Sequence, residues 1–443
     1  MRRDSSCLLA IPLFCLCAAG CHGSAPEVGG RAFGPEIRDS SGIAIIESSE
    51  PAWPAGEGWT VQDSPLLEIG AIEGDQPLLF EGIRGPTRAR DGRVFLIETG
   101  TCEIRVFDSS GNHQFSFGGK GEGPGEFRYP PTVLGITRSD TVVVIEEVPP
   151  RRTWFTLSGD FVRSEMLPWQ DLPANLLGAG PLERHIFDDG SFFQVGTLPP
   201  SNAELVGNGG FLPGPGMGRY DVQLGLVRAD NTEAVFGRFP LAHQGYPDGL
   251  SREEQVVIYD EFFAPTLTTV SHSPPAYHIA TPGAREVKTY DLNGALRRIQ
   301  RLNLPLESVT KDLVESFRLR AERTGTSKGA PVGKVRALMD QVVIPEEVFP
   351  YSDLLTDPEG NLWLLQHDQS AERGDFQWSG RWRSADGTAD FHVVHPTEGW
   401  VGTVSIPREA GVVREVGIDY VLTVRIDEFD VPYVRVYRLE KGK

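Results

Sequence analysis

The fold is decided by the run Asp91-Gly92-Arg93-Val94-Phe95-Leu96-Ile97, in the middle of residues 81–118. Asp-Gly is a tight-turn pair, and the apolar residues after it are typical of a buried strand. An alternating strand at 103–107, a turn at Ser110-Gly111 and another strand at 113–117 follow. Four antiparallel strands in about 40 residues have the length of one blade of a β-propeller.

The same pattern returns along the chain. Further units are predicted over residues 131–167, 176–241, 267–304, 354–407 and 412–439, and a Gly/Pro-rich loop at 207–218 stretches the second of these five. The last unit offers only three strands. Residues 59–69 are predicted to supply its fourth strand, which would close the ring and remove exposed sheet edges. We therefore predict an all-β, six-bladed propeller, with five or seven blades as alternatives.

Composition and charge fit a turn-rich, secreted protein. The 443 residues include 50 Gly and 34 Pro, as expected of short strands joined by many turns. The formal charge of -19 repels nucleic acid, so a nucleic-acid partner is not expected. Divalent cations or a basic protein surface fit this charge better, although excess acid also simply keeps a protein soluble.

The N-terminus has the features of an export signal. Met1-Arg2-Arg3 is basic, residues 8–19 are apolar but too short to span a bilayer, and Ala18-Ala19-Gly20-Cys21 resembles a lipobox. The resemblance implies cleavage after residue 20, a lipid on Cys21, and an exported protein anchored in the bacterial cell envelope, on the periplasmic side or at the outer membrane. Cleavage without lipid is the alternative.

The domain prediction follows from this signal. Residues 1–21 are assigned to the signal, residues 22–41 to a flexible tether, and residues 42–443 to one propeller domain. Apart from Cys21, the processed chain keeps only Cys102, so no disulfide can stabilise the domain. The apolar strand around Cys102 favours a small buried residue over a nucleophile.

A glycine cluster lies between the first two units, in the run Phe117-Gly118-Gly119-Lys120-Gly121-Glu122-Gly123-Pro124-Gly125-Glu126-Phe127. A phosphate-binding loop needs Gly-Lys followed by Ser or Thr, and Gly121 follows Lys120 instead. The cluster therefore predicts a tight crossing between blades. Together with Arg105-Val106-Phe107-Asp108 it resembles the NHL-type repeat and, more closely, the bacterial six-bladed β-propeller lipoproteins, which implies that fold for this chain.

Candidate ligand-binding residues lie where the innermost strands would begin, because propellers bind ligands in the central channel. These candidates are Glu81, Arg84, His185 and His272. Six-bladed calcium-dependent lactonases and an NHL-type lyase place metal ligands there, so functional similarity to them would make Glu81, His185 and His272 the first ligands to test. Hydrogen-bonded strand-end groups are the simpler explanation, since no His or Asp set repeats across the units.

An insert at residues 306–342 has helical periodicity. Val309, Leu313 and Phe317 recur at helical spacing, as do Val335, Leu338, Met339 and Val342, with a flexible joint at 325–333. The helices are expected to cover the ring, with a lid or partner-binding role as the alternative. In the fifth unit, Trp378, Arg381 and Trp382 form a candidate interface patch, because Trp and Arg are enriched at binding hot spots.

The sequence contains no Gly-x-Ser-x-Gly or His-Glu-x-x-His, which disfavours serine and helix-borne zinc hydrolases. The predicted function is a cell-envelope binding or scaffold module for a protein, peptide or glycan, held at the membrane only by its lipid and needing no cofactor. The alternative is a calcium- or zinc-dependent hydrolase or lyase with its site in the channel, so the sequence does not decide whether the chain is an enzyme.

Overall fold

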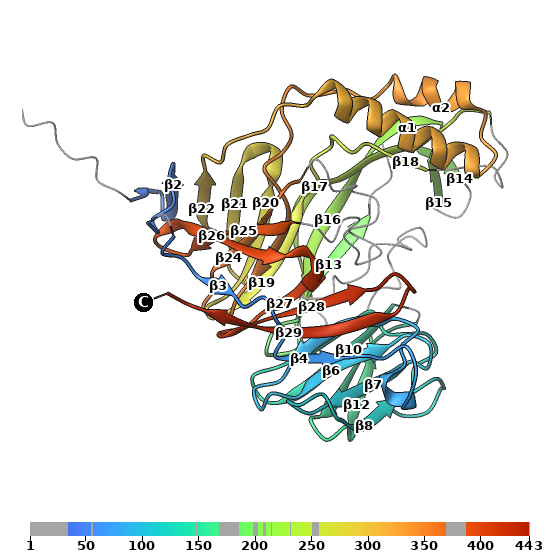
Figure 1. The fold of residues 1–443 in the computed structure, drawn as a ribbon, viewed down its shortest axis with the longest axis vertical. Coiled ribbons are helices and arrows are strands. Elements are labelled where there is room, and N and C mark those ends of the chain that lie inside the picture. Colours follow the sequence, from blue (N-terminus) through green and yellow to red (C-terminus); the bar gives the residue numbers. More distant parts are fainter. Residues whose placement is uncertain are drawn as a thin grey trace, which may run out of the picture. The chain divides into compact units, whose positions relative to one another are not determined.

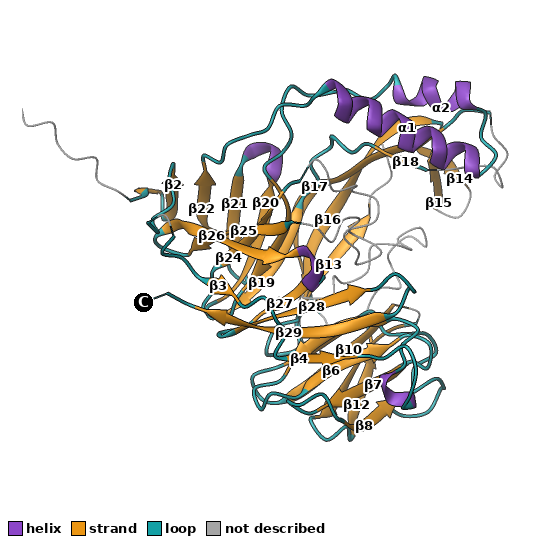
Figure 2. Cartoon of the chain, in the orientation of Figure 1, coloured by secondary structure: helices purple, strands orange, loops and turns teal. Residues whose placement is uncertain are grey.

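The computed structural model describes residues 34–442, apart from 55, 148, 168–185, 198–202, 207–209, 214, 231, 250–256 and 369–386. Residues 34–443 form one compact unit. Strands make up most of the described chain, which confirms the predicted all-β class (Figures 1 and 2). The predictions for Cys21 and for the signal segment lie outside the described residues.

Six sheets of four to six strands and one two-stranded sheet are formed by the described residues. The first two sheets contain β5 (Ile83–Arg88), β6 (Val94–Glu98), β7 (Glu103–Phe107) and β8 (His113–Gly118), then β9 (Val133–Ile136), β10 (Thr141–Glu147), β11 (Pro150–Thr156) and β12 (Phe161–Met166). The third contains β13 (Phe192–Thr197), β16 (Gly216–Val227), β17 (Glu233–Tyr246) and β18 (Ile258–Tyr259).

The fourth sheet contains β1 (Glu36–Ser40), β2 (Ile43–Ser48), β19 (Leu267–His272), β20 (Pro275–Thr281), β21 (Glu286–Tyr290) and β22 (Leu296–Leu302). The fifth contains β23 (Tyr351–Thr356), β24 (Leu362–Gln366), β25 (Thr388–His395) and β26 (Gly399–Pro407). The sixth contains β27 (Val412–Val416), β28 (Tyr420–Ile426) and β29 (Pro432–Glu440), with β3 (Thr60–Val61) and β4 (Leu67–Ile69).

The first strands of neighbouring sheets contact one another. We call β5, β9, β19, β23 and β27 the innermost strands. Contacts run from β19 to β23, from β23 to β27, from β27 to β5 and from β5 to β9. In the third sheet Ile186 bridges to β13 and packs over Gly135 of β9, while Phe187 contacts the ring of Tyr277 on β20. The sheets thus succeed one another in a closed order, which is the arrangement of a β-propeller.

The sixth sheet combines an early segment of the chain with the last three strands. Leu67, Glu68 and Ile69 of β4 pair with Val436, Arg435 and Val434 of β29 in antiparallel register. This pairing places the segment 59–69 where the sequence analysis expected it. It covers the edge of β29, which would otherwise expose unpaired backbone groups.

Apolar side chains fill the spaces between neighbouring sheets. One cluster joins Phe95 and Val106 of the first sheet to Leu134 and Val144 of the second, and Cys102 belongs to it. Cys102 is 2% exposed, and burial raises the pKa of its thiol, as expected of a structural cysteine. The predicted role of Cys102 as a small buried residue is therefore confirmed.

Turns that begin with an aspartate recur between consecutive strands of several sheets. Asp108 and Asp291 each accept two backbone N–H bonds, from the residues two and four positions later, and Asp357 and Asp427 do the same. A short carboxylate can hold such a turn without help from the rest of the fold. The predicted likeness of the turns at 108–111 and 291–294 is thus confirmed.

The glycine cluster crosses from β8 to the start of the second sheet. Gly118 and Gly119 have positive φ angles of 85° and 98°, and Phe127 donates its backbone N–H to the carbonyl of Gly119. A Cβ at Gly118 would lie 2.7 Å from the Phe127 ring, so only glycine fits there. The predicted structural role of the cluster is supported by these contacts.

Two helices lie between β22 and β23 in the chain: α1 (Lys311–Ser327) and α2 (Val332–Met339). Thr310 caps α1, because its side chain accepts the N–H of Leu313. Phe317, Val335 and Leu338 are buried against Ile258 and Phe262 from the third sheet. The helical periodicity therefore marks the face that packs against the third sheet.

Three boundaries differ from the sequence predictions. Residues 36–40, placed in the flexible tether, form β1 because their backbone pairs with β2 while their side chains stay exposed. Part of the Gly/Pro-rich stretch 207–218 forms β15 (Gly210–Pro213), which pairs with β14 (Ala203–Val206), and the start of β16. Helix α1 continues through Gly325, which packs closely against Val335, so the predicted joint is shorter.

Candidate functional site

Glu81 and Arg84 lie where β5 begins. Glu81 is exposed, and its backbone N–H donates to Glu98 at 2.9 Å. Arg84 faces Glu147 at the end of β10: burial raises the pKa of the Glu147 carboxyl, and the charge of Arg84 and a hydrogen bond with Thr132 oppose that rise. The sequence analysis did not identify Glu147, which ends the second strand of its sheet.

His272 lies at the end of an innermost strand, whereas Glu81 and Arg84 lie at the beginning of one. It is the last residue of β19, and burial lowers the pKa of its imidazole, partly offset by Asp188. Asp188 is held by Arg138, 3.2 Å away, which follows β9. Neighbouring innermost strands run parallel, because Gly85 packs on Leu134 near their starts and Arg90 donates to the Arg138 carbonyl beyond their ends.

The structure does not bring the predicted channel residues together. Glu81 precedes β5 and Arg84 lies near its start, whereas His272 is the last residue of β19. Sequence order alone could not reveal this, because it did not fix at which end of its strand each residue lies. His185, Trp378, Arg381 and Trp382 lie outside the described residues.

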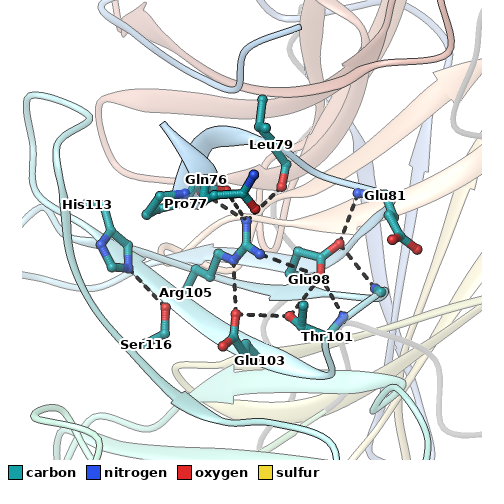
Figure 3. Close-up of polar contacts among 11 residues, drawn as sticks. Gln76, Pro77, Leu79, Glu81, Glu98, Thr101, Glu103, Arg105, His113 and Ser116 are labelled. Atoms are coloured by element: carbon teal, nitrogen blue, oxygen red, sulfur yellow. Dashed lines mark hydrogen bonds and ion pairs between the residues drawn. The ribbon is translucent and has the colours of Figure 1, made fainter. Parts of the chain in front are cut away.

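A buried ion network fixes the chain that leads into β5 (Figure 3). The Glu98 carboxylate is 1% exposed and accepts hydrogen bonds from the backbone N–H groups of Glu81, Gly100 and Thr101 and from the Thr101 hydroxyl. Arg105, 3.7 Å from Glu98, donates to the carbonyls of residues 76, 77 and 79. The hydrogen bonds drawn for Glu81 reach only its backbone nitrogen, so its carboxylate is outside the network.

The second sheet carries a related pair. Glu146, also 1% exposed, accepts the N–H of Arg128 at 3.2 Å and the Nε–H of Arg151 at 2.6 Å. Arg151 also donates to the Glu126 carbonyl, and its guanidinium lies 6.0 Å from the Phe127 ring, as Arg105 lies 5.5 Å from the Phe80 ring. Both pairs tie the segment before an innermost strand to its own sheet, which is a structural role.

A third polar cluster joins β27 to β5. Glu415 accepts hydrogen bonds from the Thr87 hydroxyl at 2.7 Å, the Arg88 N–H at 3.2 Å and the Tyr420 hydroxyl. Burial raises the pKa of Glu415 and that of Tyr420. The Arg88 guanidinium stacks 4.6 Å from the Tyr420 ring. The acceptors of Glu415 are satisfied internally, so this cluster holds two sheets together.

A pocket beside the helical insert has a different character. It measures about 300 Å³ and is lined by Arg219, His243, Asp260, Phe262, Phe263, Val343 and Pro345. His243 Nδ1 lies 2.8 Å from Asp260 Oδ2, and the Asp260 backbone N–H donates to the His243 carbonyl. Asp260 is 8% exposed and also accepts the Phe262 N–H. The pair is thus rigid, and Asp260 orients the imidazole ring.

Sequence reasoning missed this pocket. His243 is on β17 and Asp260 follows β18, so 17 positions separate them and no short motif joins them. The pairing of β17 with β18 brings the two side chains together. In the described part of the chain, no three His, Cys, Asp or Glu side chains gather closely enough to hold a metal ion. No described helix is long and apolar enough to cross a membrane.

Comparisons with known proteins give fold-level likeness only. No protein-family model matches the chain, and no curated protein matches it. A member of the DUF4221 family from Bacteroides vulgatus has a TM-score of 0.46 at 8% identity, over 87% of this chain and 99% of that one. A protein from Bacteroides fragilis, named as exported, has a TM-score of 0.44 at 10% identity, over 90% and 100%.

The calcium-binding protein regucalcin from Agrobacterium tumefaciens is also similar, with a TM-score of 0.38 at 8% identity, over 87% of this chain and 96% of that one. Identities and TM-scores this low carry no information about activity. The β-propeller assignment accordingly rests on the sheet order and on the contacts between innermost strands.

Proposed function

We propose that this chain is a lipoprotein of the bacterial cell envelope that binds a protein, peptide or glycan partner through the surface around its helical insert. The observation that carries the proposal is a concentration of exposed apolar side chains there: Val257, Tyr259, Leu319, Val332, Val343 and Ile344. They lie in or next to segments that pack on one apolar cluster, which contains Ile258, Phe317 and Val335. Contiguous exposed apolar surface marks interaction sites in soluble proteins.

The buried carboxylates on and beside the innermost strands support the same choice. Glu98, Glu146 and Glu415 are each held by hydrogen bonds from their own chain. Such groups stabilise the ring, whereas a ligand site needs polar groups that face a pocket. We take the six large sheets to be six blades of one ring, with β4 completing the last. The ring would then act as a rigid platform for the insert.

Membrane anchoring is tested by fractionation. Cys21→Ser should move the protein from the membrane fraction to the soluble fraction, because one lipidated cysteine supplies the anchor. Cys17→Ser is the matched control, since it also removes a cysteine near the predicted cleavage point. An equal distribution of both variants and the wild type would refute the anchor.

Partner binding is tested by site-specific photocrosslinking in native envelopes. A photoreactive residue at Val343 or Tyr259 should give a discrete adduct, and one at Ile418, which is 61% exposed, should not. Protease or glycosidase treatment of the adduct then separates protein from glycan partners. Equal labelling at all three positions, or none at any, would contradict binding through the insert.

The rival enzyme function has one observation in its favour. Glu147 is a partly buried carboxylate with a raised pKa near the start of β9, beside Arg84, and such groups are often found in active sites. Elemental analysis of the purified protein tests it. A stoichiometric metal that is lost in Glu147→Gln or Glu81→Gln, with hydrolase or lyase activity lost in parallel, would favour the rival over the binding module.

A further inference from the structure

From the pocket formed by Arg219, His243, Asp260, Phe262, Phe263, Val343 and Pro345, we infer a binding site for a carboxylate that is attached to an apolar group, such as the free C-terminal end of a hydrophobic peptide. We call it the insert pocket. The inference rests on the proposed binding role of the insert surface and names the chemistry that one part of this surface recognises. None of the sequence-predicted site residues belongs to it.

The size and the lining residues of the pocket indicate how large the apolar part of the ligand can be. About 300 Å³ is at the lower end of the range for ligand pockets, so it admits one large side chain and a small polar head. Phe262 lines the pocket and packs edge-on against Phe317, with ring centroids 5.3 Å apart. Val343 is 81% exposed at the rim and would be covered by a bound apolar group. Removing this surface from water favours binding.

The polar side chains of the pocket indicate which polar group of the ligand they can bind. Because His243 Nδ1 faces the Asp260 carboxylate, Nδ1 carries a proton and donates it, and the ring is held in one orientation. When Nε2 is also protonated, its N–H can donate to a carboxylate, which completes a carboxylate–imidazolium–carboxylate arrangement. Arg219 adds a guanidinium, whose planar donors match a carboxylate. Its Nε is 2.7 Å from Asp221, which fixes its position.

The charges around the pocket argue against a cationic head group and a phosphate. Both oxygens of Asp260 already accept hydrogen bonds, one from His243 and one from the Phe262 N–H. A cation in this pocket would also lie beside the guanidinium of Arg219, whose charge would repel it. Asp221 and Asp260 lie beside Arg219 and His243, and their negative charges would repel a doubly charged phosphate more strongly than a singly charged carboxylate. A carboxylate is therefore favoured over a phosphate.

The test uses fluorescence anisotropy with the full chain and three probes: labelled Ala-Ala-Phe with a free carboxylate, the same peptide as its C-terminal amide, and unlabelled 3-phenylpropionate as a competitor. The acid should bind at least about tenfold more tightly than the amide, since charge-assisted hydrogen bonds to the carboxylate are lost. Competition by phenylpropionate at similar concentration would identify small carboxylic acids as the source. Failure to compete would identify the peptide end.

Variants connect the binding to the pocket. Arg219→Gln and His243→Gln should each weaken the acid about tenfold, whereas Arg238→Gln, an exposed arginine on β17 outside the pocket, should not. Val343→Glu should repel the acid but not the amide. Ile418→Glu is its control, at an equally solvent-facing apolar position. Neither site is in the core, so folding is preserved in both.

Equal binding of acid and amide, or equal effects of Val343→Glu and Ile418→Glu, would overturn the inference. So would the absence of any binding by the acid. The proposed function is judged separately, because the crosslinks at Val343 and Tyr259 do not depend on a carboxylate. Specific crosslinking without acid binding would refute this pocket's ligand and leave the binding role of the insert surface standing.

Discussion

The first and second sheets each use a buried glutamate to hold the segment that precedes the innermost strand, but the two glutamates have different hydrogen-bond partners. In each, a glutamate at or next to the end of the second strand is 1% exposed and accepts the N–H of a residue that precedes the innermost strand. Glu98 is held mainly by backbone and hydroxyl donors, and these hold the pKa of its carboxyl below the usual value despite burial. Glu146 relies on Arg151, and burial raises its pKa. Equal burial therefore does not imply an equal electrostatic environment.

The largest expected effect tests the difference between Glu98 and Glu146 directly. Glu98→Gln should lower the free energy of unfolding by about 3 kcal/mol, because an amide cannot accept all the N–H bonds and leaves buried donors unpaired. Glu146→Gln should cost about 1 kcal/mol, since Arg151 is partly exposed and can turn to solvent. Urea unfolding followed by tryptophan fluorescence measures both. Equal losses would show that the two carboxylates contribute in the same way.

A second pair concerns the glycine crossing between the same two sheets. Gly118→Ala should cost about 2–3 kcal/mol, from a positive φ and a clash with the Phe127 ring. Gly119→Ala should cost about 1 kcal/mol, because its φ is also positive but no atom lies within 4 Å of its Cβ. The unfolding midpoints of the two variants test this. A larger loss in Gly119→Ala would mean that the ring contact does not matter.

The pH dependence of stability should sharpen the contrast. The pKa of Glu98 is lowered in the folded state, so its contribution is present above the usual glutamate pKa and is lost as pH falls below it. The pKa of Glu146 is raised, so folding is favoured by its neutral form and loses stability as pH rises past the usual value. Stability–pH curves of Glu98→Gln and Glu146→Gln should therefore differ from the wild type on opposite sides of that value.

The smallest effect is expected at the surface of the same crossing. Arg128 and Glu122 form an ion pair with both side chains more than half exposed. Solvent screens such pairs, so Arg128→Gln should leave the unfolding midpoint within experimental error. Its backbone N–H bond to Glu146 is kept. A clear loss of stability would indicate that the pair is coupled to the buried network.

The sheets were readable from the sequence because alternation and Asp-Gly turns are local signals. Strands β5–β8 fall inside the predicted unit 81–118, and the helical periodicity identified Phe317 and Val335 as buried. The buried ion pairs were not found, since Glu98 and Arg105 look like ordinary polar positions in two strands. One signal was available. In both sheets a phenylalanine precedes a charged residue, Glu81 or Arg128, and the glutamate that accepts the backbone N–H of that residue follows it 17 or 18 positions later.

The candidate site was less predictable for a physical reason. A ligand pocket depends on which side chains converge across strands, and His243 meets Asp260 through the pairing of β17 with β18. The ends of the innermost strands were equally hidden, so His272 was grouped with Glu81 although they lie at opposite ends. Local sequence patterns therefore predict the strands of this protein, whereas its candidate binding site depends on contacts between segments that are distant in the sequence.

The pairing of β4 with β29 has a consequence for biogenesis. Leu67 is made early and its partner Val436 almost last, so the sixth sheet cannot be completed until nearly the whole chain has left the ribosome. Such a distant closure is slow, and it leaves the nascent polypeptide extensible for longer. The closed ring is therefore a property of the complete polypeptide, and a chain that stops before β29 would leave the edge of β4 unpaired.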